Sequence, residues 1–367
     1  MSRIPLIKPY MDNRIRQRVL DVLDSGYLTE GPVTAEFEAA CRHYIGCEHA
    51  LAVCNCTVGL EAALRCIGVG PGDEVIVPDY TYPATAAAAN LIGATVVLVD
   101  VDPHSFLIDV DALEAAYTPR TKAVIPVSLF GSPLDYDAVM AWAHGRGVVV
   151  IEDAACSIGA EYKGRKVGNC ADITVFSFHP RKFITTGEGG LITTNNPAWA
   201  KWLDAYKHFG MTAMSSREGA QFGMVGTNYK LSNILSAVGL GQMERIDALL
   251  ARRRALARRY TELLRSVPGV GLPTNTPGGL HSFQTYCVLI PDRDRIMKSL
   301  RAADIEVQIG SYALHLHPAY AESAHCRWIG PLAGSKKAYA QALALPLYHD
   351  MTEADQDRVL HALKRAL

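Results

Sequence analysis

The sequence lacks three features that mark large classes of protein: an excess of one charge, cysteine pairs at metal-binding spacing, and a hydrophobic leader. Its 367 residues carry 36 Lys and Arg against 37 Asp and Glu, for a net charge of −1. A chain this close to neutrality has no overall field that would draw it to nucleic acid or to an anionic membrane. Residues 1–10 mix charges with prolines and contain no long apolar core. We therefore expect neither a signal peptide nor a membrane anchor.

The cysteines and histidines do not form a metal-binding pattern. The nine cysteines include no C-x-x-C pair and are odd in number, which is typical of reduced thiols in the cytoplasm. Among the twelve histidines, His315 and His317 are expected on a strand, where alternate residues point to opposite faces. Since no cysteine pair completes a zinc set, we expect no metal site.

Short apolar runs alternate with amphipathic stretches, and 49% of the chain is hydrophobic. This alternation predicts an α/β fold: a mostly parallel sheet flanked by helices, followed by a smaller C-terminal α+β domain. We place the large domain at residues 1–245 and the small domain at 246–367, joined by a long helix near 231–265. Another helix is expected over 34–44, with Thr34 as a candidate cap. Strands are expected at 74–77, 95–99, 123–127, 148–151, 173–176, 191–194 and 282–290, with a turn-rich boundary at 273–279 and a helix at 293–303.

Five arginines cluster on the expected long helix: Arg252, Arg253, Arg254, Arg258 and Arg259. Leucines are interleaved with them. This pattern favours a solvated face of an amphipathic helix over a site for a polyanion.

The most informative stretch is SFHPRKFITTGEGG at 177–190, where Lys182 lies between a strand that ends in a hydroxyl and a glycine-rich turn. A lysine amine can form an imine with an aldehyde cofactor, and pyridoxal phosphate (PLP) is the cofactor that commonly uses this bond. A solvated loop lysine is the alternative. PLP also needs a partner for its pyridine nitrogen, a surface for its ring and a cup for its phosphate, so the neighbours of Lys182 decide between the two.

Candidates for the ring are Asp153 and Tyr82. Asp153 follows the apolar run 148–151, which places it at the carboxyl end of a buried strand, where open α/β sheets bind ligands. A carboxylate there can keep the pyridine nitrogen protonated, although a helix cap is the alternative. Tyr82 follows the strand at 74–77 and can stack on the ring, or it can be a packed loop residue.

The phosphate candidates lie at a predicted helix start. Residues 54–57 lead into a helical pattern, so free backbone N–H groups at Cys56 and Thr57 can bind an anion. The Thr57 hydroxyl can add a hydrogen bond, and Ser177, at the end of the strand 173–176, can add another from across the sheet. Either hydroxyl residue alone would be interpreted as a cap or turn residue.

Taken together, these segments resemble the DegT/DnrJ/StrS family of sugar aminotransferases, PLP-dependent enzymes with the aspartate aminotransferase (type I) fold. The resemblance runs nearly end to end, and several ordered motifs are more specific than any one of them. The segments are SGYLTEGP at 25–32, GDEVIVP at 72–78, EDAA at 152–155, the lysine segment, GTNYK at 226–230 and LPLY at 345–348. The resemblance implies that Lys182 is the Schiff-base lysine, Asp153 the partner of the pyridine nitrogen and Tyr82 the stacking ring, with Thr57 and Ser177 at the phosphate.

The resemblance also implies that Asn228 reaches the phosphate of a neighbouring subunit, so that the active unit is a homodimer with two shared sites. Two residues depart from the family pattern. Cys156 stands where many relatives have glutamine or histidine near the cofactor oxygen, and Ser128 stands where histidine is frequent. Cys156 can contact the cofactor or simply pack against its ring. Relatives that are sugar dehydratases have histidine in place of Lys182, so its presence favours amino transfer.

The family implies L-glutamate as donor and a nucleotide-linked keto sugar, most often 4-keto-6-deoxy, as acceptor, in a ping-pong reaction. Candidate acceptor contacts are His179, Arg181, Tyr312 and His315, although Tyr312 is equally consistent with a packed aromatic and His315 with a buried, satisfied histidine. Arg181 can meet a carboxylate or a pyrophosphate. Three alternatives stay open: an acceptor that is a cyclic polyol ketone or an aromatic amine precursor, a PLP-dependent dehydratase, and a non-catalytic regulator with the same fold.

Overall fold

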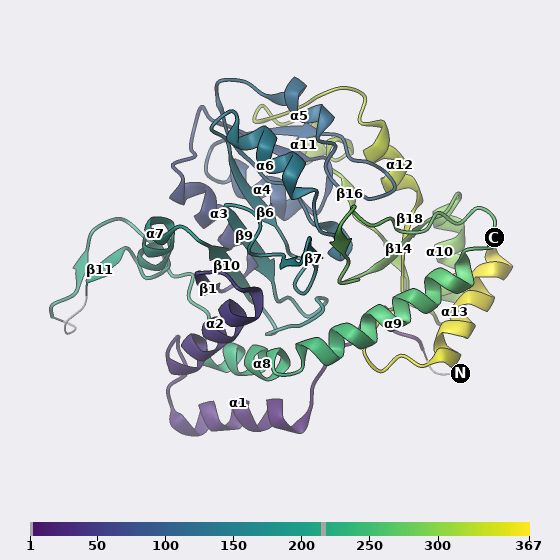
Figure 1. The fold of residues 1–367 in the computed structure, drawn as a ribbon, viewed down its shortest axis with the longest axis horizontal. Helices are drawn as coiled ribbons and strands as arrows, with labels where there is room; N and C mark the ends of the chain where they lie inside the picture. The colour runs from purple at the N-terminus through teal and green to yellow at the C-terminus, as the bar shows by residue number, and fades with distance from the viewer. Residues whose placement is uncertain (1–2, 214–217) are drawn as a thin grey trace.

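A large eight-stranded sheet forms the centre of the computed structural model, which describes residues 3–213 and 218–367 (Figure 1). Its strands pair in parallel except at β1–β10 and β10–β9, which are antiparallel. The strand order is β1 (His49–Val53), β10 (Gly190–Thr194), β9 (Ile173–Ser177), β6 (Val149–Asp153), β5 (Thr121–Val124), β2 (Glu74–Pro78), β4 (Thr95–Val99) and β17 (Cys326–Trp328). The predicted fold class and the six predicted strands of this sheet are confirmed, with ends that differ by up to three residues.

Both faces of this sheet are buried, as expected for parallel strands covered by crossover helices. Along β2, Val75 and Val77 pack into one apolar cluster and Ile76 into another on the opposite face. The first face is covered by α3 (Cys56–Cys66), α4 (Pro83–Asn90) and α7 (Pro197–Lys207), and the second by α5 (Asp111–Ala116) and α6 (Tyr136–His144).

The predicted long helix is two helices, α8 (Asn233–Met243) and α9 (Ile246–Leu264). The break follows Gln242, whose buried side-chain amide exchanges two hydrogen bonds of 2.9 Å with the backbone of Thr185. Arg245, with φ −114° and ψ 1°, leaves the helical conformation. Helix α8 packs against α1 (Asn13–Ser25) and α2 (Pro32–Ile45), and α9 continues toward the C-terminal helix (Figure 1).

Thr34 is not the cap of α2, as we had predicted it could be. Gly31 occupies the cap position and Pro32 the first turn, where its missing N–H costs nothing. Thr34 is instead buried inside the helix, and its hydroxyl lies 2.9 Å from the hydroxyl of Ser236 on α8.

A second, antiparallel sheet contains β14 (Tyr286–Leu289), β18 (Ala342–Leu345) and β15 (Gln308–Ile309). It shares an apolar core with α9, α10 (Arg293–Ala302) and α13 (Glu353–Ala366). The strand predicted at 282–290 is thus shorter, and the helix predicted at 293–303 is confirmed. The domain boundary at 245 stays a prediction. Two segments cross this boundary in space. Strand β17, which follows residue 245, pairs in the large sheet, and Ile4, which precedes it, packs into the core of the second sheet.

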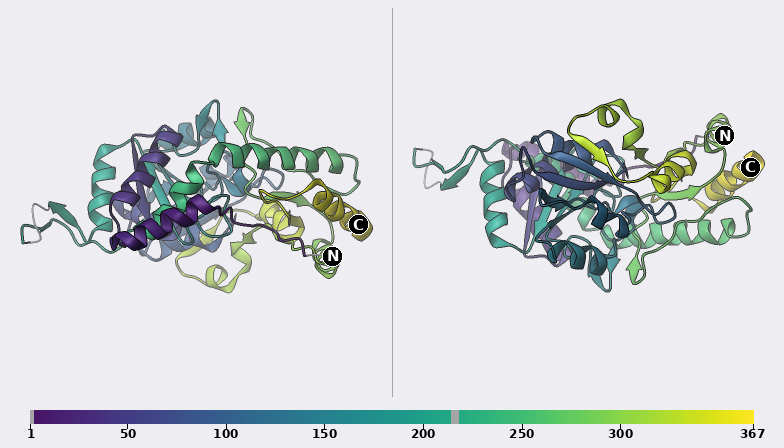
Figure 2. Two further views of the ribbon diagram at one scale, coloured as in Figure 1. Left: turned by 90° about the horizontal axis from the view of Figure 1, so that it is seen from below. Right: turned by 90° about the horizontal axis from the view of Figure 1, so that it is seen from above.

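The remaining elements are short. The predicted strand at His315 is wrong, because this residue lies in the 3-10 turn η2 (Leu314–Leu316), next to α11 (Pro318–Ala321). The hairpin of β11 (Met211–Ala213) and β12 (Gln221–Phe222) projects from the body (Figure 2). The others are β3 (Tyr80–Thr81) paired with β16 (Tyr312–Ala313), β7 (Glu161–Tyr162) with β8 (Arg165–Lys166) and β13 (Gly279–Leu280), η1 (Leu129–Gly131) and α12 (Ala333–Gln341).

The arginine cluster on α9 forms the predicted solvated face only in part, since Arg252 and Arg258 are exposed but Arg253 is not. Arg253 is buried and donates to the carbonyl oxygens of Phe283 and Gln284, at 3.0 and 2.9 Å. Arg254 donates to two other carbonyls, and Arg252 to a third. These side chains join α9 to the segments packed on it.

Within the described ranges, every helix is too short or too polar to cross a bilayer.

Candidate active site

Lys182 lies in the loop that connects β9 to β10. The pairing of the two strands ends at Ser177 and Gly190. Beyond this pair, the Phe178 N–H donates to the Gly189 carbonyl and the Thr186 N–H donates to the Phe178 carbonyl, so the loop folds back on itself. The Lys182 Nζ donates a 3.3 Å hydrogen bond to the Sγ of Cys156. Burial disfavours the ammonium, but the negative potential of Cys156 and Asp153 outweighs it, so the pKa of Lys182 lies above its ordinary value.

Asp153 ends β6 on the same side of the sheet as Lys182 and is buried. Its Oδ2 accepts a 2.7 Å hydrogen bond from the Thr85 hydroxyl on α4, and its Oδ1 accepts from the Ala155 N–H at 3.1 Å. Burial raises the pKa of Asp153, while these hydrogen bonds and Lys182 act in the opposite direction. Thr85 was missed from the sequence, because nothing in its own segment shows that it faces a carboxylate 68 residues away.

The start of α3 meets the end of β9 beside this pair. Asn55 caps the helix by accepting from the Val58 N–H at 3.0 Å, and the first helical hydrogen bond runs from Gly59 N–H to Asn55 O. The N–H groups of Cys56 and Thr57 precede that bond and are the anion-binding groups of a helix start.

Gly190 allows this approach. A Cβ at Gly190 would lie 2.7 Å from the carbonyl carbon of Asn55, so a larger residue would push β10 away from the helix start. Because Gly190 pairs with Ser177, the Ser177 hydroxyl reaches the same corner as Thr57. The Cys56 thiol points elsewhere, toward the carbonyl of Val175 at 3.9 Å, and burial raises its pKa well above the ordinary value. Cys56 therefore offers its backbone and not its side chain.

A cavity of about 170 Å³ opens beside Lys182. The large sheet and its loops contribute Cys156, Arg181, Lys182 and the ring of Tyr82, which is 64% exposed. Opposite them lie residues of the second sheet and its flanking segments: Leu6, Ile7, Gln284, Thr285, Gln308, Ile309, Gly310, Ser311, Ala344, Leu345 and Leu347. Leu129 and Phe130 of η1 complete an apolar wall. The cavity thus combines one amine and a flat aromatic surface with a mostly apolar enclosure.

The other predicted contacts lie around this cavity at different distances. His179 accepts from the Arg181 N–H at 3.2 Å, and the Arg181 guanidinium donates to the Gln308 side chain at 3.2 Å. Tyr312 lies behind Tyr82, with ring centroids 6.2 Å apart. His315 is outside the lining: its Nδ1 lies 2.7 Å from the buried carboxylate of Asp79.

Asn228 also lies outside the lining, and its Oδ1 accepts from the Lys230 ammonium at 2.6 Å. The segment that carries both residues runs beside the approach to α3, since Cys54 N–H donates to Tyr229 O at 2.9 Å. Asn228 therefore lies one residue from the contact with Cys54 and near the start of α3, with its side chain turned to Lys230 in its own segment.

Two residues that sequence analysis missed hold the lysine loop from the second-sheet side. The Gln284 amide donates a 2.7 Å hydrogen bond to the carbonyl of Arg181, next to Lys182. The Arg253 guanidinium holds the carbonyls before and at Gln284 and lies 5.2 Å from the ring of Phe183, on the other side of Lys182. Burial lowers the pKa of Arg253 to about 10. No local pattern signals these contacts, because their partners are 30 to 103 residues apart in the sequence.

Ser128 belongs to a network on the opposite face of β6. The carboxylate of Glu152 is fully buried and accepts from the hydroxyls of Ser128, Tyr136 and Thr174, the last two at 2.6 and 3.2 Å. Burial raises the pKa of Glu152 to about 7. Because successive residues of a strand face opposite sides, the Glu152 carboxylate lies in the core on one face of the sheet and Asp153 lies on the other face.

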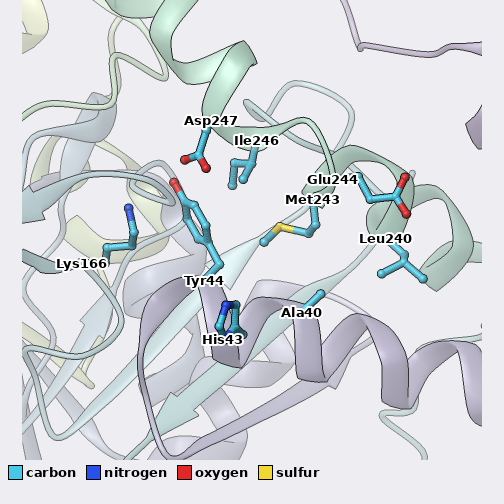
Figure 3. Close-up of a pocket in the computed structure, with 9 residues that line it drawn as sticks. All are labelled: Ala40, His43, Tyr44, Lys166, Leu240, Met243, Glu244, Ile246 and Asp247. Carbon is cyan, nitrogen blue, oxygen red and sulfur yellow. The ribbon is translucent and has the colours of Figure 1, made fainter.

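A larger groove of about 440 Å³ lies elsewhere, between α2 and the junction of α8 with α9 (Figure 3). Its lining includes Tyr44, Lys166 and Asp247 and shares no residue with the cavity at Lys182. The Lys166 ammonium lies 4.3 Å from the Tyr44 ring centroid and 3.2 Å from Glu161. These contacts engage the Lys166 ammonium within the protein.

The residues around Lys182 fit PLP on chemical grounds: a half-buried amine, a buried carboxylate near it, an exposed aromatic ring and a helix start with free N–H groups. Comparisons with known proteins agree. The model of the DegT/DnrJ/EryC1/StrS aminotransferase family matches residues 9–364. A GDP-perosamine synthase of Caulobacter vibrioides is 39% identical, with 100% of this chain and 99% of the relative covered.

Solved structures give the same result. S. venezuelae DesV, solved in complex with a ketimine intermediate, is 33% identical with a TM-score of 0.92, over 100% of this chain and 98% of that one. A protein of Streptococcus pneumoniae named as a sugar aminotransferase is 28% identical over 100% of this chain and 98% of its own. It has been solved in PLP and PMP forms, with TM-scores of 0.92 and 0.93. The chain therefore belongs to the DegT/DnrJ/EryC1/StrS aminotransferase family, and it is a PLP-dependent aminotransferase.

Proposed function

We propose that this enzyme transfers the amino group of L-glutamate to a nucleotide-linked 4-keto-6-deoxy sugar, with GDP as the nucleotide. The observation that carries the proposal is Lys182 in the lining of one cavity with the buried carboxylate of Asp153 near it, in a chain 39% identical over its whole length to a GDP-perosamine synthase. The product is then an amino sugar linked to GDP. Two half-reactions share the one site, so the kinetics are ping-pong.

Each cofactor contact follows from the chemistry of the group it meets. When bound, PLP supplies an aldehyde for a covalent bond to an amine and a ring that withdraws electrons from the substrate Cα. Lys182 forms that bond through Nζ. Asp153 holds the proton on the pyridine nitrogen, since a buried carboxylate stabilises a neighbouring cation. Tyr82 covers one face of the ring. Cys156, whose Sγ lies 3.3 Å from the Lys182 Nζ, would lie near the bond between Lys182 and the cofactor.

The corner between α3 and β9 would hold the cofactor phosphate. The backbone N–H groups of Cys56 and Thr57 at the start of α3, with the hydroxyls of Thr57 and Ser177, would bind this anion. These groups would anchor the cofactor independently of its bond to Lys182.

Lys182 is also the acid and base of both half-reactions. Once the donor's amine has released it, the Lys182 Nζ takes the proton from the donor Cα, and in the second half-reaction it delivers a proton to the sugar carbon that receives nitrogen. The apolar wall of Leu129, Phe130 and Leu345 keeps bulk water from these protons.

Arg181 meets the anionic group of each substrate in turn. Its guanidinium is exposed and its contact within the chain is with a neutral amide, that of Gln308, so its charge is left for a carboxylate or a pyrophosphate. His179 and Tyr312 lie close enough to Arg181 and Tyr82 to extend this substrate region. His315 is the weakest candidate, because Asp79 already engages it.

The active unit is a homodimer in this proposal. Large apolar side chains are exposed near Asn228: Phe209 is 52% and Val225 95% exposed, and Tyr27 and Phe222 are also uncovered. An apolar surface of this kind favours contact with another protein surface. A second copy of the chain would cover it and bring Asn228 to the phosphate of the partner. Light scattering tests this, and a monomer with full activity would contradict it.

The functional test is an absorbance spectrum of the PLP-loaded protein. Addition of L-glutamate is expected to bleach the visible band of lysine-bound cofactor, and a GDP-linked 4-keto-6-deoxy sugar is expected to restore it. Keto sugars on other nucleotides and a cyclic polyol ketone are the comparison acceptors. If glutamate leaves the band unchanged, the amino donor is wrong. If only a different ketone restores it, the acceptor is wrong and the aminotransferase assignment stands.

A further inference from the structure

One contact of Lys182 has no role in the transfer reaction: its bond to a thiol. The Lys182 Nζ lies 3.3 Å from the Sγ of Cys156, and both residues line the same cavity. Cys156 is one of nine free cysteines. Within the described ranges it is the cysteine whose sulfur accepts a hydrogen bond from an ammonium group.

The thiol of Cys156 is accessible from the cavity, whereas the nearby thiol of Cys56 is buried. Cys156 is half-buried, and the cavity beside it, at about 170 Å³, is wide enough for a small oxidant. Cys56 is buried behind the site with its thiol toward Val175, and burial raises its pKa. A buried thiol of this kind is unreactive, whereas a cavity-facing sulfur beside a cation is the environment in which cysteines are oxidised.

We propose that Cys156 is a site of reversible oxidation, at which a peroxide joins its sulfur to Lys182 through an S–N bond. In the first step the Cys156 thiolate attacks one oxygen of the peroxide. An S–O bond forms, the O–O bond breaks, and the departing hydroxide takes a proton from the Lys182 ammonium to leave as water.

In the second step the neutral Lys182 Nζ attacks the sulfenic sulfur, a reaction known for backbone nitrogen. The N–S bond forms and the S–O bond breaks, and the hydroxide that leaves takes a proton from the nitrogen. In sum, one thiol, one amine and one hydrogen peroxide give one S–N bond and two waters. The sulfur loses two electrons and the peroxide gains them. A thiol reductant reverses the bond and releases both side chains.

The bond removes the amine on which cofactor binding depends. That consequence rests on the proposed role of Lys182, but formation of the bond does not. Bound PLP and the oxidant compete for the same residue, so the cofactor-loaded enzyme resists peroxide and the cofactor-free enzyme does not.

The test treats the full chain with hydrogen peroxide, with and without saturating PLP, and maps the peptides by mass spectrometry without reduction. The expected product is one species in which the peptides of Cys156 and Lys182 are joined with the loss of two hydrogen atoms. It forms in the PLP-free protein, is suppressed by PLP and disappears with dithiothreitol. Cys156→Ser is expected to abolish it, and Cys54→Ser, which removes another partly exposed thiol, to leave it intact.

Three outcomes overturn the proposal. One is oxygen added to the Cys156 peptide while Lys182 stays free. Another is a disulfide between Cys156 and Cys56, which Cys56→Ser would remove. The third is a PLP-free protein in which the peptides of Cys156 and Lys182 both stay unmodified. An S–N bond that forms equally with and without PLP would leave the bond standing and contradict the role of Lys182 in cofactor binding. Because mass spectrometry reports the bond directly, these results are independent of whether the enzyme transfers amino groups to sugars.

Discussion

The two walls of the Lys182 cavity are built differently. The large-sheet side carries Lys182 in its lining and, outside the lining, the other chemical groups at strand ends and a helix start: Asp153, Ser177 and Thr57. The wall from the second sheet carries Gln284 and, behind it, Arg253, which hold the backbone on either side of Lys182 through carbonyls and a ring. The first wall supplies reactivity and the second fixes where the reactive amine points. Substitutions in the two walls should therefore fail in different ways.

Lys182→Ala should have the largest effect. Without Nζ, neither the covalent bond to PLP nor the proton transfer at Cα can occur, so we expect kcat to fall by at least about a thousandfold. The visible band of bound cofactor should be lost while the thermal unfolding curve stays cooperative. Lys201→Ala, at an exposed lysine on α7, is the control and should retain the band.

Asp153→Asn should bind PLP but lose on the order of a hundredfold in kcat, because an amide does not stabilise the protonated ring nitrogen. The matched control is Glu152→Gln, one residue away on the opposite face of β6. It should keep kcat per folded molecule. Equal losses of kcat in the two variants would show that the cavity face of β6 has no special role.

Gln284→Leu tests the second wall. Loss of the 2.7 Å bond to the Arg181 carbonyl should let the lysine loop shift and lower kcat roughly tenfold to a hundredfold, with the cofactor still bound. The pH at which the visible band titrates should also move. Arg254→Met, next to Arg253 on α9, breaks carbonyl contacts away from Lys182 and should lower the melting temperature without moving that titration.

The smallest effect concerns stability and pH. The pKa of Glu152 is raised from 4.5 to about 7 by burial, so between these values the folded state binds more protons than the unfolded state. The free energy of unfolding must then fall as pH rises from 4.5 to 7. Glu152→Gln removes this contribution, along with about 1–3 kcal/mol of hydrogen bonding. Melting temperatures across that range should show a shallower decline in Glu152→Gln than in the wild type, and parallel curves would contradict the assignment.

The large-sheet side and the second-sheet side of the cavity also differ in how far the sequence predicts them. Asp153, Ser177 and Thr57 could be predicted to lie near one another, because each follows a short apolar strand or opens a helix, and parallel strands bring such ends to one edge. Gln284 and Arg253 were not found, because their partners are set by how α9 and the second sheet pack on the lysine loop. Arg253 was even predicted to be solvated, since a polar residue in a leucine-rich helix is normally outside.

Two local breaks in regular secondary structure could not be predicted from the hydrophobic pattern either. The helical period continues through Glu244 and Arg245, and the end of α8 is set by the bonds between Gln242 and Thr185. His315 fits a strand by alternation, but its bond to Asp79 holds it in a 3-10 turn. Long-range polar contacts override the periodicity in both places.

The most direct test of the account is to identify the residue that binds the cofactor. The PLP-loaded protein would be reduced with borohydride, which makes the bond between amine and cofactor permanent, then digested and sequenced by mass spectrometry. The account predicts pyridoxyl modification at Lys182 and at no other lysine in stoichiometric yield. Modification at another lysine, or none, would contradict the assignment of this cavity as the active site.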